Sequence, residues 1–159
     1  MSETLYIETS ILGYLTARST KNLILAANME VTKDWWEYRR SAFTLYVSQA
    51  VLNEVAQGDT EIAVQRMELL RGVPSLELNQ AVRDLASQFL TRSNLPPKAH
   101  IDAIHIAVAT VHGLDYLLTW NCKHIANAQI QRKLAEISFD FGYELYQFPK
   151  VLLQIWLLK

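Results

Sequence analysis

The sequence contains little cysteine, glycine or proline. Cys122 is the single cysteine, and five glycines and four prolines are spread over 159 residues. One cysteine excludes an internal disulfide. No repeat, low-complexity tract or evident linker interrupts the chain, and half of its residues are hydrophobic, which argues against disorder. We expect one domain of ordinary size that folds without a disulfide or a structural metal.

The sequence also lacks a charge excess and a long apolar run. Its formal net charge is -1, so any polyanionic substrate must be attracted locally. The longest apolar stretch, residues 151–158, is far shorter than the roughly 20 residues of a membrane-spanning helix. The amino-terminal MSETLYIETS has no basic region followed by an apolar one. We therefore expect a cytoplasmic protein without a membrane segment.

Several common catalytic motifs are missing. The chain has no P-loop, no GxGxxG and no GxSxG sequence, and it lacks the grouped thiols and imidazoles of zinc sites. These absences remove nucleotide-binding, serine-hydrolase and structural-zinc interpretations.

Apolar periodicity and capping residues predict alternating strands and helices. This alternation predicts an α/β fold with a parallel sheet covered on both faces, in which sites form beyond the carboxyl ends of the strands. A helix capped by Thr32 is expected to carry Trp35 and Trp36, and a short helix is expected from Lys123. The expected strands are 5–7, 43–47, 75–78, 116–118 and 144–146, and the other expected helices are 9–15, 48–58, 60–70, 79–90, 98–112 and 128–140.

Four isolated polar residues lie where apolar strands end or helices begin. Glu8 follows a strand, Glu54 lies on the helix after the second strand, Asp102 opens the sequence DAIHIAVA, and Asn121 follows LDYLLTW. Carboxylates are costly to bury unless a cation or a donor offsets the desolvation. A shared Mg²⁺ or Mn²⁺ ion would do so, because these cations bind carboxylate and amide oxygens. Clustered acids would also raise at least one carboxyl pKa when no cation is bound.

Three segments resemble a known family in their order and spacing. They are LYIETSILGYL, LYVSQAVLNEVAQGD and DAIHIAVATVHGLDYLLTWNCKHIAN. Together they are similar to the signature stretches of PIN-domain ribonucleases, particularly the VapC-like toxins of bacterial toxin-antitoxin systems. The resemblance implies a three-layer α/β/α fold with a parallel sheet of about five strands, acidic residues around Mg²⁺ or Mn²⁺, and cleavage of RNA.

The resemblance also implies roles for individual residues. Glu8 matches the first acid of the family, Asp102 the central acid, and Asn121 the place of a fourth acid, so these three are the expected metal ligands. Glu54 matches the glutamate after the second strand and is expected to bind a second ion or to position the attacking water. All four are the expected catalytic residues.

Two of these residues depart from the family pattern. Glu8 stands where aspartate is usual, and Asn121 supplies an oxygen without a negative charge. We expect both changes to weaken metal binding. The alternative hypothesis is a PIN-fold RNA-binding or regulatory protein with weakened catalysis.

Each candidate also has a purely structural interpretation. Glu8 can cap a helix, Asp102 can be stabilised by a helix dipole, Glu54 can be an exposed helix acid, and Asn121 can close a turn.

The neighbouring polar side chains are equally open to two interpretations. Thr9, Ser10 and Thr119 are candidates for phosphate binding, for orienting the acids, or for capping. His105 and His124 lie near the acids in sequence, and packed, hydrogen-bonded histidines are expected there.

We expect a PIN domain over residues 1–148 and an apolar tail over residues 149–159. The tail is too apolar to be left exposed, so it is expected to pack on the domain or to form an interface. The expected partners are an RNA substrate, a protein antitoxin and a second copy of the chain. A third hypothesis is a structural subunit that acts through the tail.

Overall fold

The central sheet has five parallel strands in the order β3-β2-β1-β4-β5. A computed structural model of the chain describes residues 2–144 and 147–152. β1 lies at the centre of the sheet, so its carboxyl end is flanked on both sides. The strands are β1 (Glu3–Ile7), β2 (Phe43–Ser48), β3 (Ser75–Leu76), β4 (Tyr116–Leu118) and β5 (Lys150–Leu152).

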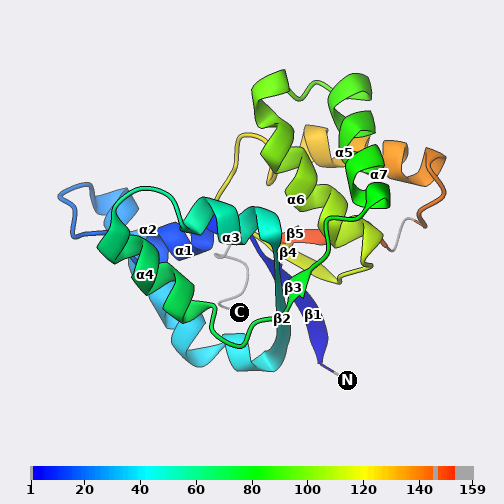
Figure 1. Cartoon of the computed structure of the whole chain (residues 1–159). Coiled ribbons are helices and arrows are strands. Elements are labelled where there is room, and N and C mark those ends of the chain that lie inside the picture. The colour runs from blue at the N-terminus through cyan, green and yellow to red at the C-terminus, as the bar shows by residue number, and fades with distance from the viewer. Residues whose placement is uncertain (1, 145–146, 153–159) are drawn as a thin grey trace.

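Helices cover both faces of the sheet (Figure 1). The chain moves outward from β1 to β3 and then returns through β4 to β5, so right-handed crossovers place the helices before β3 on one face and those after it on the other. The first layer contains α1 (Thr9–Leu15), α2 (Leu23–Tyr38), α3 (Gln49–Val55) and α4 (Thr60–Leu69), and the second contains α5 (Gln80–Arg92), α6 (His100–Val111) and α7 (Ala128–Asp140). The expected three-layer α/β/α fold is therefore confirmed.

Polar side chains fix the amino ends of several helices. Asn22, Asp59, Asn79 and Asn127 each accept a hydrogen bond from a backbone N–H in the first turn of the helix that follows. These bonds satisfy donors that have no partner within the helix. The helix expected to start at residue 79 begins with the cap at Asn79.

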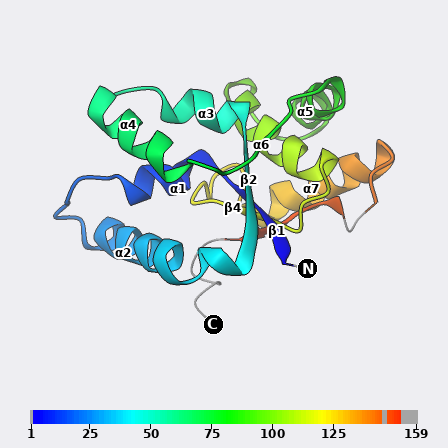
Figure 2. The same ribbon diagram turned by 60° about the horizontal axis from the view of Figure 1, so that its bottom comes forward.

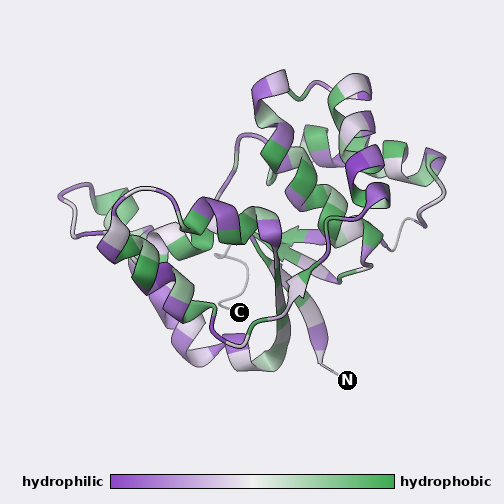
Figure 3. Ribbon diagram, viewed as in Figure 1, coloured by the Kyte–Doolittle hydropathy of each residue, from purple (hydrophilic) through white to green (hydrophobic). Residues whose placement is uncertain are grey.

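The core lies between the sheet and the two helical layers. One apolar face of α5 is buried, and α6 is buried along most of its length. Figure 3 shows the resulting bands of hydrophobic and hydrophilic residues on the helices. Trp35 and Trp36 of α2 are also buried.

Two local expectations are wrong, and a third falls mostly outside the described residues. Thr32 does not begin a helix: α2 starts nine residues earlier, after its cap at Asn22, and Thr32 bonds to the backbone oxygen of Asn28. The residues from Lys123 form turns instead of a helix. The fifth strand of the sheet is Lys150–Leu152, and of the expected strand 144–146, residues 145 and 146 lie outside the described part.

The placement of β5 also bears on the expected tail. Leu118 of β4 pairs with Leu152 of β5, so the sheet continues past residue 148. Residues 150–152 therefore pack on the domain, whereas residues 153–159 lie outside the described residues. Within the described ranges, no helix has the length and apolar character needed to cross a membrane.

Candidate metal centre

Two neighbouring strands bring Glu8 and Asn121 to the same edge of the sheet. Ile7 and Leu118 are register partners at the carboxyl ends of β1 and β4. The backbone N–H of Glu8 donates to the Leu118 carbonyl oxygen at 3.1 Å. The segment from Thr119 to Asn121 therefore leaves the sheet beside Glu8.

Glu8 is buried, with only 5% of its surface exposed. Three donors reach its Oε2: the Ser10 backbone N–H at 3.1 Å, the Thr119 hydroxyl at 2.7 Å, and the Ser10 hydroxyl. The first of these makes Glu8 the N-cap of α1, so the capping interpretation is confirmed. The same bonds hold the carboxylate at the edge of the sheet, where a ligand role remains a prediction.

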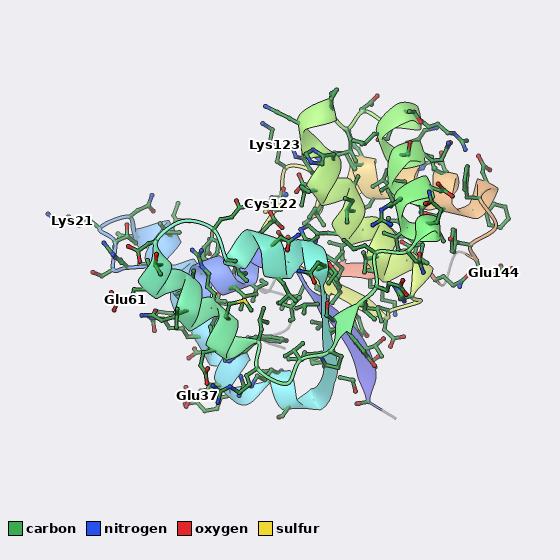
Figure 4. All side chains as sticks on the ribbon, viewed as in Figure 1. Lys21, Glu37, Glu61, Cys122, Lys123 and Glu144 are labelled. Atoms are coloured by element: carbon green, nitrogen blue, oxygen red, sulfur yellow. The ribbon has the colours of Figure 1, made fainter. Side chains whose placement is uncertain are left out.

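Asp102 reaches the same region from the first turn of α6. Its Oδ2 lies 2.7 Å from Nδ1 of His124. The backbone N–H of His124 donates to Oδ1 of Asn121 at 3.0 Å, which is the turn-closing bond that the structural interpretation of Asn121 expects. In Figure 4 the labelled Cys122 and Lys123, which follow Asn121, lie on the loop beside α6.

A continuous chain of hydrogen bonds joins three of the four candidates. The Asn121 backbone N–H donates to the Thr119 hydroxyl oxygen at 2.9 Å, and that hydroxyl donates to Glu8. His124 links Asn121 to Asp102. This chain connects Asp102 to Glu8 and Asn121, which lie at the carboxyl end of the sheet.

Glu54 belongs to a second, neighbouring cluster. Its Oε1 accepts the Thr9 hydroxyl at 2.6 Å and lies 2.7 Å from Nε2 of His105. Because Thr9 and Ser10 are consecutive, the two clusters share the start of α1. Figure 2 shows α3, which carries Glu54, beside α6, which carries His105.

The electrostatics of Glu54 differ from those expected of clustered acids. Burial raises the pKa of its carboxyl, but the hydrogen bond and electrostatic attraction of the His105 ring and the hydrogen bond from Thr9 outweigh burial. The pKa of Glu54 is therefore lowered and the carboxylate is favoured. The direction is the reverse of the rise expected from repulsion between acids.

The expected substrate-binding residues contact the acids instead of facing open solvent. The Thr9 hydroxyl bonds to Glu54, and the Ser10 and Thr119 hydroxyls bond to Glu8. Thr119 is fully buried, whereas Thr9 and Ser10 are half-buried. The structure supports their orienting role, and phosphate contact remains a prediction.

The donor chemistry around Glu8 fits a hard divalent cation. Two carboxylates and one amide supply oxygen ligands, and Mg²⁺ needs few protein ligands because it retains several waters. No group of three or more His, Cys, Asp or Glu side chains in the described part of the chain is placed to hold an ion. A set of two carboxylates and one amide would not form such a group. Glu8, Asp102 and Asn121 are the residues that would hold a cation.

The sequence did not predict the hydrogen bonds that connect Glu54 to His105 and His105 to Tyr6. His105 was expected to be a packed, hydrogen-bonded histidine, and this is confirmed by its complete burial. Its spacing of three residues from Asp102 on one helix was the available indication that it faces the site. The contribution of Tyr6 had no sequence indication, because its hydroxyl approaches His105 from another part of the chain.

Comparison with known families adds one finding. The PIN domain family matches residues 5–125, which span all four candidate residues. The match confirms the family expected from the three quoted segments. No curated protein matches the sequence.

Proposed function

The chain belongs to the PIN-domain family, and we propose that it is an endoribonuclease that hydrolyses RNA phosphodiesters with Mg²⁺ or Mn²⁺. PIN domains are generally metal-dependent nucleases, so membership of the family supports a hydrolase. The observation that carries the proposal is the hydrogen-bond chain that joins Glu8, Asn121 and Asp102 at one end of the sheet.

Glu8, Asp102 and Asn121 would hold the cation through their oxygen atoms. A bound divalent cation lowers the pKa of a water ligand and neutralises charge that develops on the phosphodiester. Ser10 and Thr119 keep the Glu8 carboxylate in place by donating to its Oε2. His124 holds Asp102 in the same way from the following loop.

Glu54 would position the attacking water or a second ion. Among the described residues, both groups that contact its carboxylate reach Oε1, which leaves Oε2 for water or substrate. The lowered pKa keeps this carboxylate in the form that accepts hydrogen bonds from water. The expected products carry 5′-phosphate and 3′-hydroxyl ends, because no histidine pair is needed as acid and base.

The biological role proposed for this nuclease is that of a VapC-like toxin in the cytoplasm. Its partners would be an RNA substrate, a protein antitoxin and a second copy of the chain. The apolar sequence of residues 153–159, LQIWLLK, supports a protein interface.

A weakened nuclease that binds or regulates RNA is the second candidate. It is favoured by Asn121, which lacks the charge of the acid often found at its place in the family, and by the protein donors that already contact Glu8 and Asp102. Metal affinity distinguishes the two candidate functions, because the departures from the family pattern at Glu8 and Asn121 both act on it.

The substitution Asn121→Asp tests this alternative. The new carboxylate can accept the His124 N–H as the amide does, and its charge adds to the attraction for a cation. We expect Mn²⁺ to bind about tenfold more tightly, which corresponds to about 1.4 kcal/mol. Calorimetric titration of both proteins measures the change, and an unchanged affinity would show that Asn121 is only a turn residue.

The proposed function is tested with purified full-length protein and two labelled oligonucleotides of one sequence, RNA and DNA. We expect cleavage of the RNA with Mn²⁺ or Mg²⁺, no cleavage after EDTA treatment, and recovery when Mn²⁺ is restored. Phosphatase and ligase treatment of the products identifies their ends. Cleavage that persists in EDTA, or 2′,3′-cyclic phosphate ends, would contradict the proposed chemistry.

A further inference from the structure

A buried row of hydrogen bonds runs from the core to Glu54. The Tyr6 hydroxyl lies 2.7 Å from the Ser48 hydroxyl and 2.8 Å from Nδ1 of His105. The opposite ring nitrogen, Nε2, lies 2.7 Å from Oε1 of Glu54. Ser48, Tyr6 and His105 are fully buried, whereas the Glu54 side chain is 35% exposed. The row therefore ends at the one member that solvent reaches.

One arrangement of protons satisfies every member of this row with a neutral imidazole. The Ser48 hydroxyl donates to the Tyr6 oxygen, the Tyr6 hydroxyl donates to Nδ1 of His105, and Nε2–H of His105 donates to Glu54. Burial raises the pKa of the Tyr6 phenol, which keeps its proton available for donation. Because Nδ1 accepts the Tyr6 proton, the ring proton of the neutral imidazole is held on Nε2, the nitrogen next to Glu54.

We propose that His105 is a positioning residue, which Tyr6 holds in the Nε2–H tautomer so that it fixes the rotamer of the Glu54 carboxylate. This inference rests on the proposed function, because it takes Glu54 as the group that orients water or a second ion. Thr9 donates to the same Oε1 at 2.6 Å. With Oε1 held on two sides, Oε2 is presented in one orientation.

The placement of His105 favours this role over packing alone. It bridges the two layers: His105 lies on α6, and Glu54 lies on α3. A buried imidazole needs a hydrogen-bond partner at each ring nitrogen, whereas an apolar side chain of similar size would fill the same space without that requirement. The contact with His105 also contributes to the lowered pKa of Glu54.

Two substitutions at His105 separate the contact made by Nε2 from the contact made by Nδ1. In His105→Gln the side-chain amide reaches about as far as Nε2 and can still donate to Glu54. In His105→Asn the shorter amide takes the place of Nδ1, near Tyr6, and falls short of Glu54. Loss of a residue that supports a catalytic group typically costs about 10- to 100-fold in activity.

Steady-state cleavage of a fluorogenic RNA with Mn²⁺ measures both variants. We expect His105→Asn to lower kcat by about 10- to 100-fold with KM changed less than about twofold, and His105→Gln to retain most of kcat. His112→Asn is the matched control, because His112 bonds to the Glu77 carbonyl oxygen, away from the site. Equal losses in the Asn and Gln variants, or no loss in either, would overturn the proposal.

The tautomer is read directly and without activity by two-bond ¹H–¹⁵N spectra of protein with labelled histidine. We expect the Nε2–H pattern for His105, and a loss of that preference in Tyr6→Phe, which removes the hydroxyl at nearly constant shape. An Nδ1–H pattern in the wild-type chain would overturn the proposal even if the His105 variants fail to fold.

The two readouts separate this inference from the proposed function. If the wild-type chain cleaves no RNA but His105 shows the Nε2–H pattern, the nuclease proposal fails and the geometry at Glu54 stands. If the chain cleaves RNA and His105 shows the other tautomer, the nuclease proposal stands and the positioning role fails.

Discussion

Single residues at the site combine a structural contact with a proposed chemical one. Glu8 caps α1 through the Ser10 N–H, and Asp102 contacts His124. A carboxylate that accepts hydrogen bonds at one oxygen can still bind a cation through its remaining lone pairs. The capping role and the ligand role are therefore compatible.

Replacing Asp102 by asparagine tests its ligand role by removing one negative charge. The amide is nearly isosteric with the carboxylate, so the fold should persist while metal binding loses a negative ligand. We expect Mn²⁺-dependent cleavage to fall at least about 100-fold, in the range seen when a group that stabilises developing charge is removed. Asp34→Asn, on the exposed side of α2, is the control. Undiminished cleavage by the Asp102 variant would remove Asp102 from the metal centre.

The lowered pKa of Glu54 has a consequence for stability. Its ordinary value is 4.5, and the folded value is lower. Above pH 4.5 the carboxylate is ionised in both states and the stabilisation is fully present. As the pH falls below 4.5 the unfolded chain takes up the proton first, so stability is lost until the pH has passed the folded pKa.

We therefore expect the stability advantage of the wild-type chain over Glu54→Gln to shrink as the pH falls below 4.5 and through the lowered pKa of the folded state. Urea unfolding of both proteins at several pH values gives the difference. A difference that is constant with pH, or that grows on acidification, would contradict the lowered pKa.

Individual helices depend on caps that the sequence makes visible. The Asn79 side chain accepts the Val82 N–H at 3.0 Å at the start of α5. Asn79→Ala should cost about 1 kcal/mol, the typical loss for an asparagine cap. In a chain of this size that lowers the unfolding temperature by about 3 °C. Asn28→Ala, inside α2, should change it much less, and equal shifts would contradict the capping account.

Helices and strands were predictable where pattern and cap agreed. The expected range of α1 is matched to the residue, and α7 likewise spans Ala128–Asp140. The start of α2 was missed because its first turn carries Leu23 and Ile24 in exposed positions, so the apolar pattern there does not mark a buried face. The last strand was missed because Lys150–Leu152 joins the sheet by pairing with β4, which local sequence does not encode.

Over the whole molecule, the location of the site was predictable and its hydrogen bonds were not. Parallel strands place Glu8 and Asn121 at one edge, which follows from their positions after two apolar segments. The bond of His105 to Tyr6 joins residues 99 apart in sequence. Long-range polar contacts of this kind depend on side-chain placement in the folded chain, so spacing alone could not give them.

The apolar sequence at the end of the chain predicts that the protein forms a dimer. Residues 153–159 include Ile155, Trp156 and three leucines, enough to favour association when they are buried against a second copy. We expect the full chain to be a dimer in solution and a chain ending at Leu152, which retains β5, to be a monomer. Light scattering measures both masses. A full chain that stays monomeric at high concentration would contradict the dimer.

The most direct test of the central claim is a crystal of the full chain soaked in Mn²⁺ and measured at a wavelength where manganese scatters anomalously. We predict one anomalous peak within about 2.0–2.4 Å of oxygens from Glu8, Asp102 and Asn121, the range of bonds between hard cations and oxygen ligands. A Mn²⁺ peak only at other residues, from a protein that cleaves RNA in the same buffer, would contradict the assignment of this edge of the sheet as the metal centre.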